Sequence, residues 1–290
     1  MGLGFIGLGT MGAPMVLNLL KAGFKLKVYD VDSERVKKVV ECGAEPACCP
    51  REVASESEFI LLCLPSGTVS EEVTIGGGGV VQSAQPGSVI VELSTVPPST
   101  IRKIASAAEP LGVDVLDAPV SGGRSGAEEA TLTIMVGGRR DVFDRSIPIL
   151  KAIGREIYYV GGLGSGQTVK LLNNMRVLID LVTSRYMLEI GVRAGVDLKL
   201  LQEIINKSTG QSWVWTNWVP KFIQGQSLGA TINIFNKDMT NAIEIAESFN
   251  VYPEVAMAAL KEIKTYLERS MGGSDISAMF NSILRSESNI

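Results

Sequence analysis

The sequence predicts an α/β protein in which the first half forms a doubly wound, mostly parallel sheet and the second half is all-helical. Short, continuously apolar runs alternate with amphipathic stretches up to about residue 160, which is typical of parallel strands joined by helices. Beyond that point no segment has a convincing strand pattern. Residues 167–194 contain few helix breakers and predict one long helix, with several shorter helices after it.

Seven segments of the first half are candidate strands. They are residues 4–7, 26–29, 59–64, 88–92, 113–116, 131–136 and 156–160. Helices are predicted between most of them, for example over 12–22 and 33–42.

A glycine-rich stretch over residues 161–166 separates the two patterns. We therefore predict a dinucleotide-binding-type α/β domain over 1–162 and an all-helical domain over 163–290 that begins with a long interdomain helix. The 290 residues are enough for two ordinary domains with hydrophobic cores.

The composition limits the possible partners and compartment. The net charge is −4 with acids and bases interspersed, so neither nucleic acid nor an anionic membrane is an expected partner. No apolar run approaches the roughly 20 residues that span a bilayer, and because the sequence opens directly on a motif we expect no signal peptide. The four cysteines are expected to be reduced and buried. We expect a cytoplasmic protein that acts on a small molecule.

Histidine is absent from the sequence. Its absence excludes Ser-His-Asp and Cys-His nucleophiles, a histidine general base and the common histidine zinc sites. Acid–base chemistry must therefore rest on Lys, Asp, Glu, Tyr or Cys, and no metal site is expected.

A G-x-G-x-x-G pattern follows the first candidate strand and opens the first candidate helix, and it predicts a Rossmann-type dinucleotide site. Its residues are Gly7, Leu8, Gly9, Thr10, Met11 and Gly12. The first glycine suits the tight turn, the second lets the backbone approach a pyrophosphate, and the third lets helix pack on strand. A glycine-rich turn without a ligand is the alternative for this pattern alone.

Asp30 ends the second candidate strand, 18 residues after Gly12, where a carboxylate binds a ribose 2′-hydroxyl. Val31 and Asp32 follow it, and neither can neutralise a 2′-phosphate. The sequence therefore favours NAD over NADP as the cofactor.

Lys170 and Asn174 lie four residues apart near the start of the long helix, so their side chains share one face. In a chain without histidine, a lysine near the domain boundary is a candidate proton-transfer group. A solvated helix lysine is the alternative that this spacing leaves open.

Four motifs in order give the chain a resemblance to the β-hydroxyacid dehydrogenase family, which includes 3-hydroxyisobutyrate dehydrogenase and tartronate semialdehyde reductase. The resemblance covers about Gly4 to Phe280. The motifs are GFIGLGTMG at 4–12, DAPVSGG at 117–123 followed by Gly126-Ala127, GSGQTVKLLNN at 164–174, and Lys237-Asp238.

The resemblance implies a role for each matching residue. Lys170 would be the general acid/base, and Asn174 would orient it or the substrate hydroxyl. Ser121, Gly122 and Gly123 would bind the substrate carboxylate. Further cofactor contacts are implied for Leu64, Pro65, Thr95 and Lys237. The implied fold is that of 6-phosphogluconate dehydrogenase, although those enzymes are longer and place a histidine near the lysine, where this chain has Asn173.

Two positions depart from the family pattern. Ala230 stands where members often have phenylalanine, and Arg124 follows the substrate loop where a small or neutral residue is usual. A larger pocket with a cation would suit a substrate with a second carboxylate or a sulfonate. A solvent-facing arginine is the alternative.

The resemblance implies an NAD-dependent enzyme that oxidises a small 3-hydroxy acid or reduces its semialdehyde, and that assembles as a homodimer or homotetramer. The alternatives are a non-catalytic dinucleotide-binding sensor and a reductase for a dianionic aldehyde acid.

Overall fold

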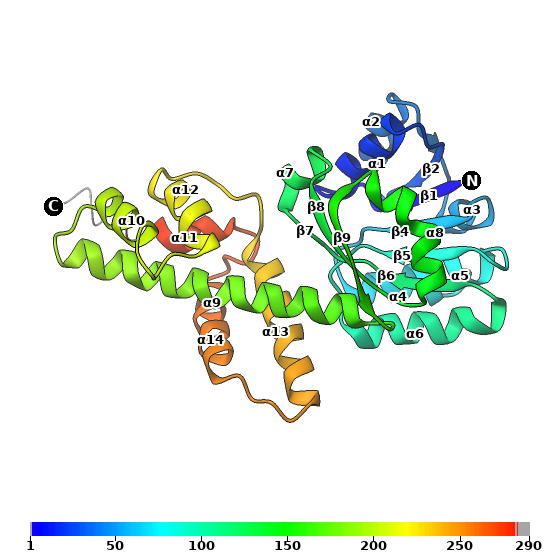
Figure 1. The fold of residues 1–290 in the computed structure, drawn as a ribbon. Helices are drawn as coiled ribbons and strands as arrows, with labels where there is room; N and C mark the ends of the chain where they lie inside the picture. Colours follow the sequence, from blue (N-terminus) through cyan, green and yellow to red (C-terminus); the bar gives the residue numbers. More distant parts are fainter. Residues whose placement is uncertain (1, 282, 284–290) are drawn as a thin grey trace. The chain divides into compact units, whose positions relative to one another are not determined.

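The computed structural model describes residues 2–281 and 283 and contains two compact units, Met1–Lys170 and Leu171–Ile290, here the N-terminal and C-terminal units (Figure 1). Within the described residues, no helix combines the length and apolar character needed to cross a bilayer.

A single sheet organises the N-terminal unit, with the described strands in the order β3-β2-β1-β4-β5-β6-β8-β7, and with β9 also paired to β8. The strands are β1 Leu3–Ile6, β2 Leu26–Tyr29, β3 Glu45–Pro46, β4 Phe59–Leu62, β5 Val89–Glu92, β6 Asp114–Asp117, β7 Val120–Ser121, β8 Leu132–Gly137 and β9 Gly154–Gly161. The pairs from β3 to β6 are all parallel, and β8 runs antiparallel to β6 and β7. The predicted doubly wound, mostly parallel sheet is confirmed.

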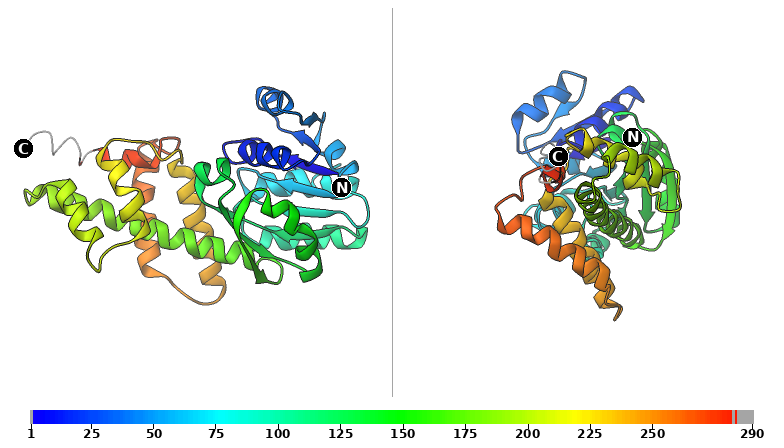
Figure 2. Two further views of the ribbon diagram at one scale, coloured as in Figure 1. Left: turned by 45° about the horizontal axis from the view of Figure 1, so that its top comes forward. Right: turned by 90° about the vertical axis from the view of Figure 1, so that its left-hand side faces the viewer.

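Helices cover both faces of this sheet, as the views in Figure 2 show for the N-terminal unit. The helices of the unit are α1 Gly12–Lys21, α2 Ser33–Val40, α3 Pro50–Ser55, α4 Gly67–Ile75, α5 Val80–Ser83, α6 Pro98–Ala108, η1 Glu109–Leu111, α7 Gly123–Glu128 and α8 Arg140–Lys151. The predicted helices over 12–22 and 33–42 end one and two residues earlier in the structure.

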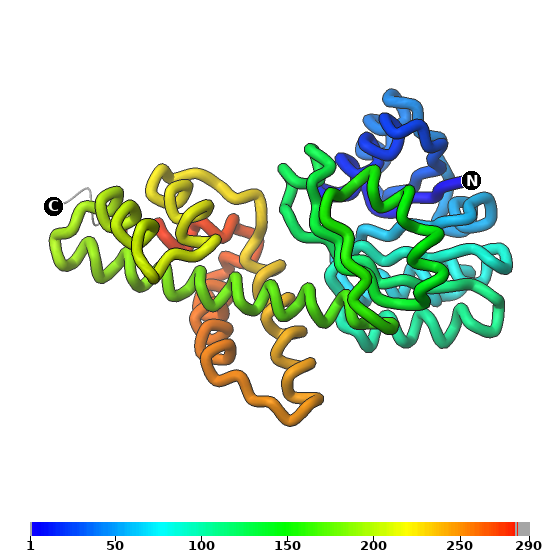
Figure 3. Tube along the Cα trace, viewed as in Figure 1, coloured from blue at the N-terminus to red at the C-terminus, as the bar shows by residue number. Residues whose placement is uncertain are grey.

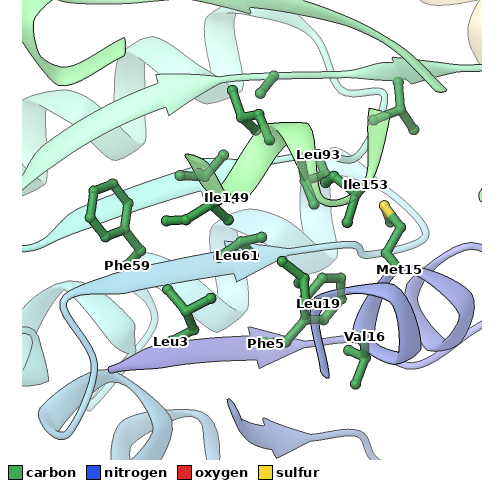
Figure 4. Close-up of a cluster of buried hydrophobic side chains, with 14 of the residues drawn as sticks. Leu3, Phe5, Met15, Val16, Leu19, Phe59, Leu61, Leu93, Ile149 and Ile153 are labelled. Atoms are coloured by element: carbon green, nitrogen blue, oxygen red, sulfur yellow. The ribbon is translucent and has the colours of Figure 1, made fainter. Parts of the chain in front are cut away.

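Two apolar clusters fill the space between sheet and helices. Phe5 and Leu61 of the sheet pack with Met15 of α1 and Ile149 of α8 on one face (Figure 4). On the other face, side chains of α3, α5 and α6 pack on alternate residues of the same strands. Burial from both sides explains why β1 and β4 have continuous apolar sequences and why β5 is apolar up to its last residue, Glu92.

The C-terminal unit consists of helices and their connections, with no β-strand among its described residues and one isolated β-bridge between Thr231 and Asp275 (Figure 3). Its helices are α10 Leu198–Asn206, α11 Trp213–Asn217, α12 Val219–Ile223, α13 Ile232–Ser248, α14 Glu254–Glu268 and η2 Ile276–Phe280, together with most of α9 Ser165–Arg193, which begins in the N-terminal unit. Trp215 is buried in its core, whereas Trp213 is mostly exposed.

The expectation of four buried cysteines is wrong in part. All four are reduced, but Cys42 and Cys48 are exposed because they lie in the connections around β3, a two-residue strand at the sheet edge.

Asp275 fixes a loop of the C-terminal unit. Its carboxylate accepts hydrogen bonds from the backbone N–H groups of Gly229 at 2.7 Å and Ser277 at 2.9 Å, and from the Ser227 hydroxyl at 2.7 Å. Burial acts to raise the pKa of Asp275, but the bonds from Ser277 and Ser227 outweigh it and hold this pKa at about 2. The carboxylate therefore anchors the segment that carries Ala230.

Asp275→Ala should lower the free energy of unfolding by about 2–3 kcal/mol, because several bonds to a charged acceptor are lost. All three tryptophans lie in the C-terminal unit, so urea denaturation followed by tryptophan fluorescence reports on it. In the wild type this contribution is present above the unfolded pKa of about 3.9 and is lost as the pH falls toward the folded value.

The matched control is Asp197→Ala, which removes one helix-capping bond to the Leu200 N–H at 2.7 Å and should cost about 1 kcal/mol. Equal losses in the two variants would contradict the anchoring role of Asp275.

Candidate active site

The glycine-rich turn joins the end of β1 to the start of α1, and two of its glycines are required by the fold. Gly7 has φ +98°, and a Cβ there would lie 2.2 Å from the Cys63 carbonyl oxygen. A Cβ at Gly12 would lie 1.9 Å from the Gly7 carbonyl oxygen. At Gly9 the nearest atom to an added Cβ is the Arg35 Nη1, 4.0 Å away. The space beside Gly9 is therefore open, although Gly9 belongs to the same motif.

Asp30 lies at the carboxyl end of β2, next to this turn. Its carboxylate accepts hydrogen bonds from the backbone N–H groups of Leu8 at 2.6 Å and Asp32 at 2.8 Å. Arg35, from the first turn of α2, has its Nη1 3.7 Å from Asp30 and its Nε 3.2 Å from Asp32. The positively charged Arg35 guanidinium therefore lies beside the Asp30 carboxylate.

The remaining predicted cofactor contacts of this unit follow the carboxyl ends of β4 and β5. The N–H of Leu64 donates to the Ser94 hydroxyl at 2.6 Å, and Ser94 in turn donates its N–H to the Glu92 carboxylate at 2.9 Å. Pro65 and Thr95 are the next residues of the two connections. Because the strands are parallel, these connections and the glycine turn share one edge of the sheet, where open α/β sheets bind ligands.

The predicted substrate loop extends the same edge. β6 ends at Asp117, and β7 then continues along β8, so that Ser121 pairs with Thr133. Gly122 and Gly123 have φ of +135° and +63°, conformations that favour glycine. The loop then enters α7, whose end is tied to α1 by a hydrogen bond from the Asn18 amide to the Ala127 carbonyl at 2.7 Å.

Arg124 lies in the first turn of α7. Its Nε is 2.7 Å from the Glu128 carboxylate one turn later, and about two thirds of its side chain is exposed. In the structure the Arg124 guanidinium is therefore paired with an acidic side chain of the same helix.

Lys170 is a buried residue of α9, five residues after the helix begins at Ser165. Asn174, one turn further on, donates its side-chain amide to the Asp238 carboxylate at 2.7 Å. Lys237 Nζ lies 3.3 Å from the same carboxylate, which is only 5% exposed. Within the C-terminal unit, Asp238 thus joins two residues that the sequence singled out separately.

Other polar residues near these positions were not predicted from the sequence. They are Arg35, Ser94, Asp117, Gln167 and Asp238. Asp117 is fully buried, and burial raises the pKa of its carboxyl although several backbone N–H groups act to lower it. Two kinds of signal were available in the sequence. Asp117, Gln167 and Asp238 each lie in a quoted motif, and Arg35 is spaced so that a helix starting at Ser33 brings its first turn back toward the end of β2.

Comparison with known proteins assigns both halves of the chain. Residues 2–161 match the NAD binding domain of 6-phosphogluconate dehydrogenase, and residues 164–283 match the domain described as NAD-binding of NADP-dependent 3-hydroxyisobutyrate dehydrogenase. Among solved structures, 3-hydroxyisobutyrate dehydrogenase of Mycobacterium tuberculosis, with L-serine, superimposes with a TM-score of 0.89 at 26% identity, over 97% of this chain and 98% of that one.

Relatives of known activity are closer in sequence. The 2-(hydroxymethyl)glutarate dehydrogenase of Eubacterium barkeri is 40% identical over 88% of this chain and 86% of its own. Two enzymes of Pseudomonas aeruginosa, 3-hydroxyisobutyrate dehydrogenase and NAD-dependent L-serine dehydrogenase, are 35% and 34% identical, over 84% and 95% of this chain and 85% and 95% of their own. The chain belongs to the β-hydroxyacid dehydrogenase family and is an NAD(P)-dependent hydroxyacid dehydrogenase.

Proposed function

We propose that the protein transfers hydride between a nicotinamide and a small 3-hydroxy acid of the 3-hydroxyisobutyrate type, or its semialdehyde, with Lys170 as general acid/base. The observation that carries the proposal is that the predicted site residues gather at one edge of the sheet, at the carboxyl ends of the parallel strands. The glycine turn, Asp30, Thr95 and the Ser121 loop follow the ends of neighbouring strands there. This edge can hold a cofactor and a carboxylate substrate together.

In the oxidative direction, the Lys170 amine takes the hydroxyl proton while the carbon that bears the hydroxyl loses hydride. The nicotinamide supplies the hydride acceptor. In reduction the same ammonium returns the proton. Burial of Lys170 favours this role over that of a solvated helix lysine. Asn174, fixed by Asp238, orients the hydroxyl or the lysine.

The substrate carboxylate is assigned to the Ser121 hydroxyl and to the backbone N–H groups of Gly122 and Gly123. Positive φ at both glycines supports this, because it turns the backbone in a way that side chains rarely permit.

The names of the relatives suggest the substrate class more closely. 3-Hydroxyisobutyrate, serine and 2-(hydroxymethyl)glutarate all carry a hydroxymethyl group on the carbon next to a carboxylate, and they differ only in the third substituent of that carbon. We propose that this shared unit is what the site binds. 2-(Hydroxymethyl)glutarate has a second carboxylate. This substrate of a relative, together with the two departures at Ala230 and Arg124, supports a dianionic acid as the second candidate substrate.

A substrate panel tests the proposal. Initial rates should be measured with 3-hydroxyisobutyrate, glycerate, serine, 2-(hydroxymethyl)glutarate and a sulfonate analogue, each with NAD and with NADP. Turnover of a simple 3-hydroxy acid is expected. If only dianionic acids react, and Arg124→Ala abolishes that preference, the second candidate holds. Absence of turnover despite NAD binding would support a non-catalytic sensor.

Replacement of Lys170 tests the acid/base role. Lys170→Met keeps the aliphatic length of the side chain and removes the amine, so kcat should fall about 10²- to 10⁴-fold while NADH affinity stays within about twofold. Lys151→Ala, at an exposed lysine at the end of α8, is the control and should keep wild-type rates. Near-wild-type turnover of Lys170→Met would refute the assignment.

We propose NAD as the preferred cofactor, because Asp30 would repel a 2′-phosphate and accept a bond from a ribose hydroxyl. Arg35 weakens the repulsion, since its guanidinium lies beside that carboxylate. NADP should therefore support a measurable but lower rate in the panel.

Two substitutions in the glycine turn separate folding from cofactor binding. Gly9→Ala should fold normally, because its Cβ has open space, but it should weaken NADH binding at least about tenfold because the methyl group occupies the path of the pyrophosphate. Gly12→Ala should instead destabilise the protein, because its Cβ meets backbone. NADH titration and thermal unfolding of both variants are the measurements. A Gly9→Ala protein that binds NADH normally would place the pyrophosphate elsewhere.

We also propose a homodimer or homotetramer. Several large apolar side chains of the C-terminal unit are exposed in the single chain, as association through that unit would require. They include Ile190, Ile204, Phe249, Tyr252 and Val255.

A further inference from the structure

We propose that Gln167 and Asp117 are positioning residues that hold the first turn of α9, and with it Lys170, in a fixed place relative to the loop that carries Thr95. The inference rests on the proposed role of Lys170 and concerns residues of the N-terminal unit alone.

Asp117 holds the start of the helix. The first N–H groups of any helix lack partners inside it. Here the Asp117 carboxylate accepts from the N–H of Gly164 at 2.7 Å and from the N–H of Gln167 at 2.8 Å. A Cβ at Gly166 would lie 2.2 Å from the Met135 carbonyl oxygen, so the first turn is in close contact with β8. The turn is thereby fixed both to the end of β6 and to β8.

Gln167 extends this attachment to the neighbouring loop. Its buried side-chain amide donates to the Ser94 carbonyl at 2.7 Å and accepts from the Val96 N–H at 3.0 Å. These two partners flank Thr95. Only one orientation of the amide satisfies both bonds, because one partner is an acceptor and the other a donor.

The same network reaches the β4 connection, since the Ser94 hydroxyl accepts from the Leu64 N–H. Buried, mutually satisfied hydrogen bonds of this kind fix geometry more than they add stability. Lys170 lies three residues after Gln167, within one helical turn. A displacement of about 1 Å at a reacting group can lower a rate by about 10²-fold. The amide of Gln167 is therefore the direct link between the proposed proton-transfer group and the proposed nicotinamide loop.

Gln167→Glu is the discriminating variant. An ionised carboxylate still accepts from the Val96 N–H but faces the Ser94 carbonyl with a second acceptor. The protonated acid restores the donor and has nearly the shape of glutamine. Burial next to a carbonyl raises the pKa of such an acid. At pH 9 the kcat of Gln167→Glu should therefore be about 10- to 100-fold lower than that of the wild type. The ratio of the two kcat values should rise toward one as the pH falls to 6. The substrate KM and NADH affinity should change little.

Two controls complete the experiment. Gln167→Met removes the amide at every pH and should show a low kcat without recovery. Gln85→Glu makes the same charge change at an exposed position of the same unit and should behave as wild type. A kcat ratio near one at pH 9, or a folded Gln167→Glu protein whose loss does not recover at low pH, would overturn the proposal.

The thermal stability of Gln167→Glu gives a readout that does not depend on turnover. The melting temperature should fall below that of the wild type at pH 9, and the difference should shrink as the pH falls. If wild-type protein shows no turnover in the substrate panel, the proposed function fails, while this titration still tests the hydrogen bonds of Gln167. A melting difference that does not change with pH would overturn the positioning role even then.

Discussion

Helices cover both faces of the parallel sheet, and this double burial restricts where chemistry can occur. Neither face is open to a ligand, so polar groups gather where the strands end. The connections that follow β1, β2, β4, β5 and β6 emerge at one edge because the strands run in the same direction. The glycine turn, Asp30 and the Thr95 loop are neighbours for this reason, although Gly7 and Thr95 are 88 positions apart in the sequence.

The sequence predicted features that have a local physical signature. Buried strands such as β4 were visible as apolar runs, and the turn at Gly7 was visible because positive φ requires glycine. Two-residue strands such as β3 and β7 have too few residues for a pattern. Gln167 and Asp117 lie inside two of the quoted motifs, but their role could not be assigned, because a glutamine or an aspartate gives no sign in sequence that its partners come from distant strands.

The proposed substrate class makes two demands on the site. A hydroxymethyl group beside a carboxylate calls for a fixed acid/base group and a fixed carboxylate site, and the residues assigned to these lie at the start of α9 and in the loop after β7. The third substituent varies among the relatives. Ala230, which the family resemblance associates with this part of the substrate, lies in the loop that Asp275 anchors in the C-terminal unit.

The physical reason for glycine at position 9 differs from the reason at the other two glycine positions of the motif. Gly7 and Gly12 are required by steric contact with the chain itself, whereas Gly9 faces open space, and in the proposed function that space holds the pyrophosphate. Protein stability alone therefore places no restriction on position 9. If the proposed pyrophosphate contact holds, a descendant of this fold that no longer bound dinucleotides would be free to lose Gly9 before Gly7 or Gly12.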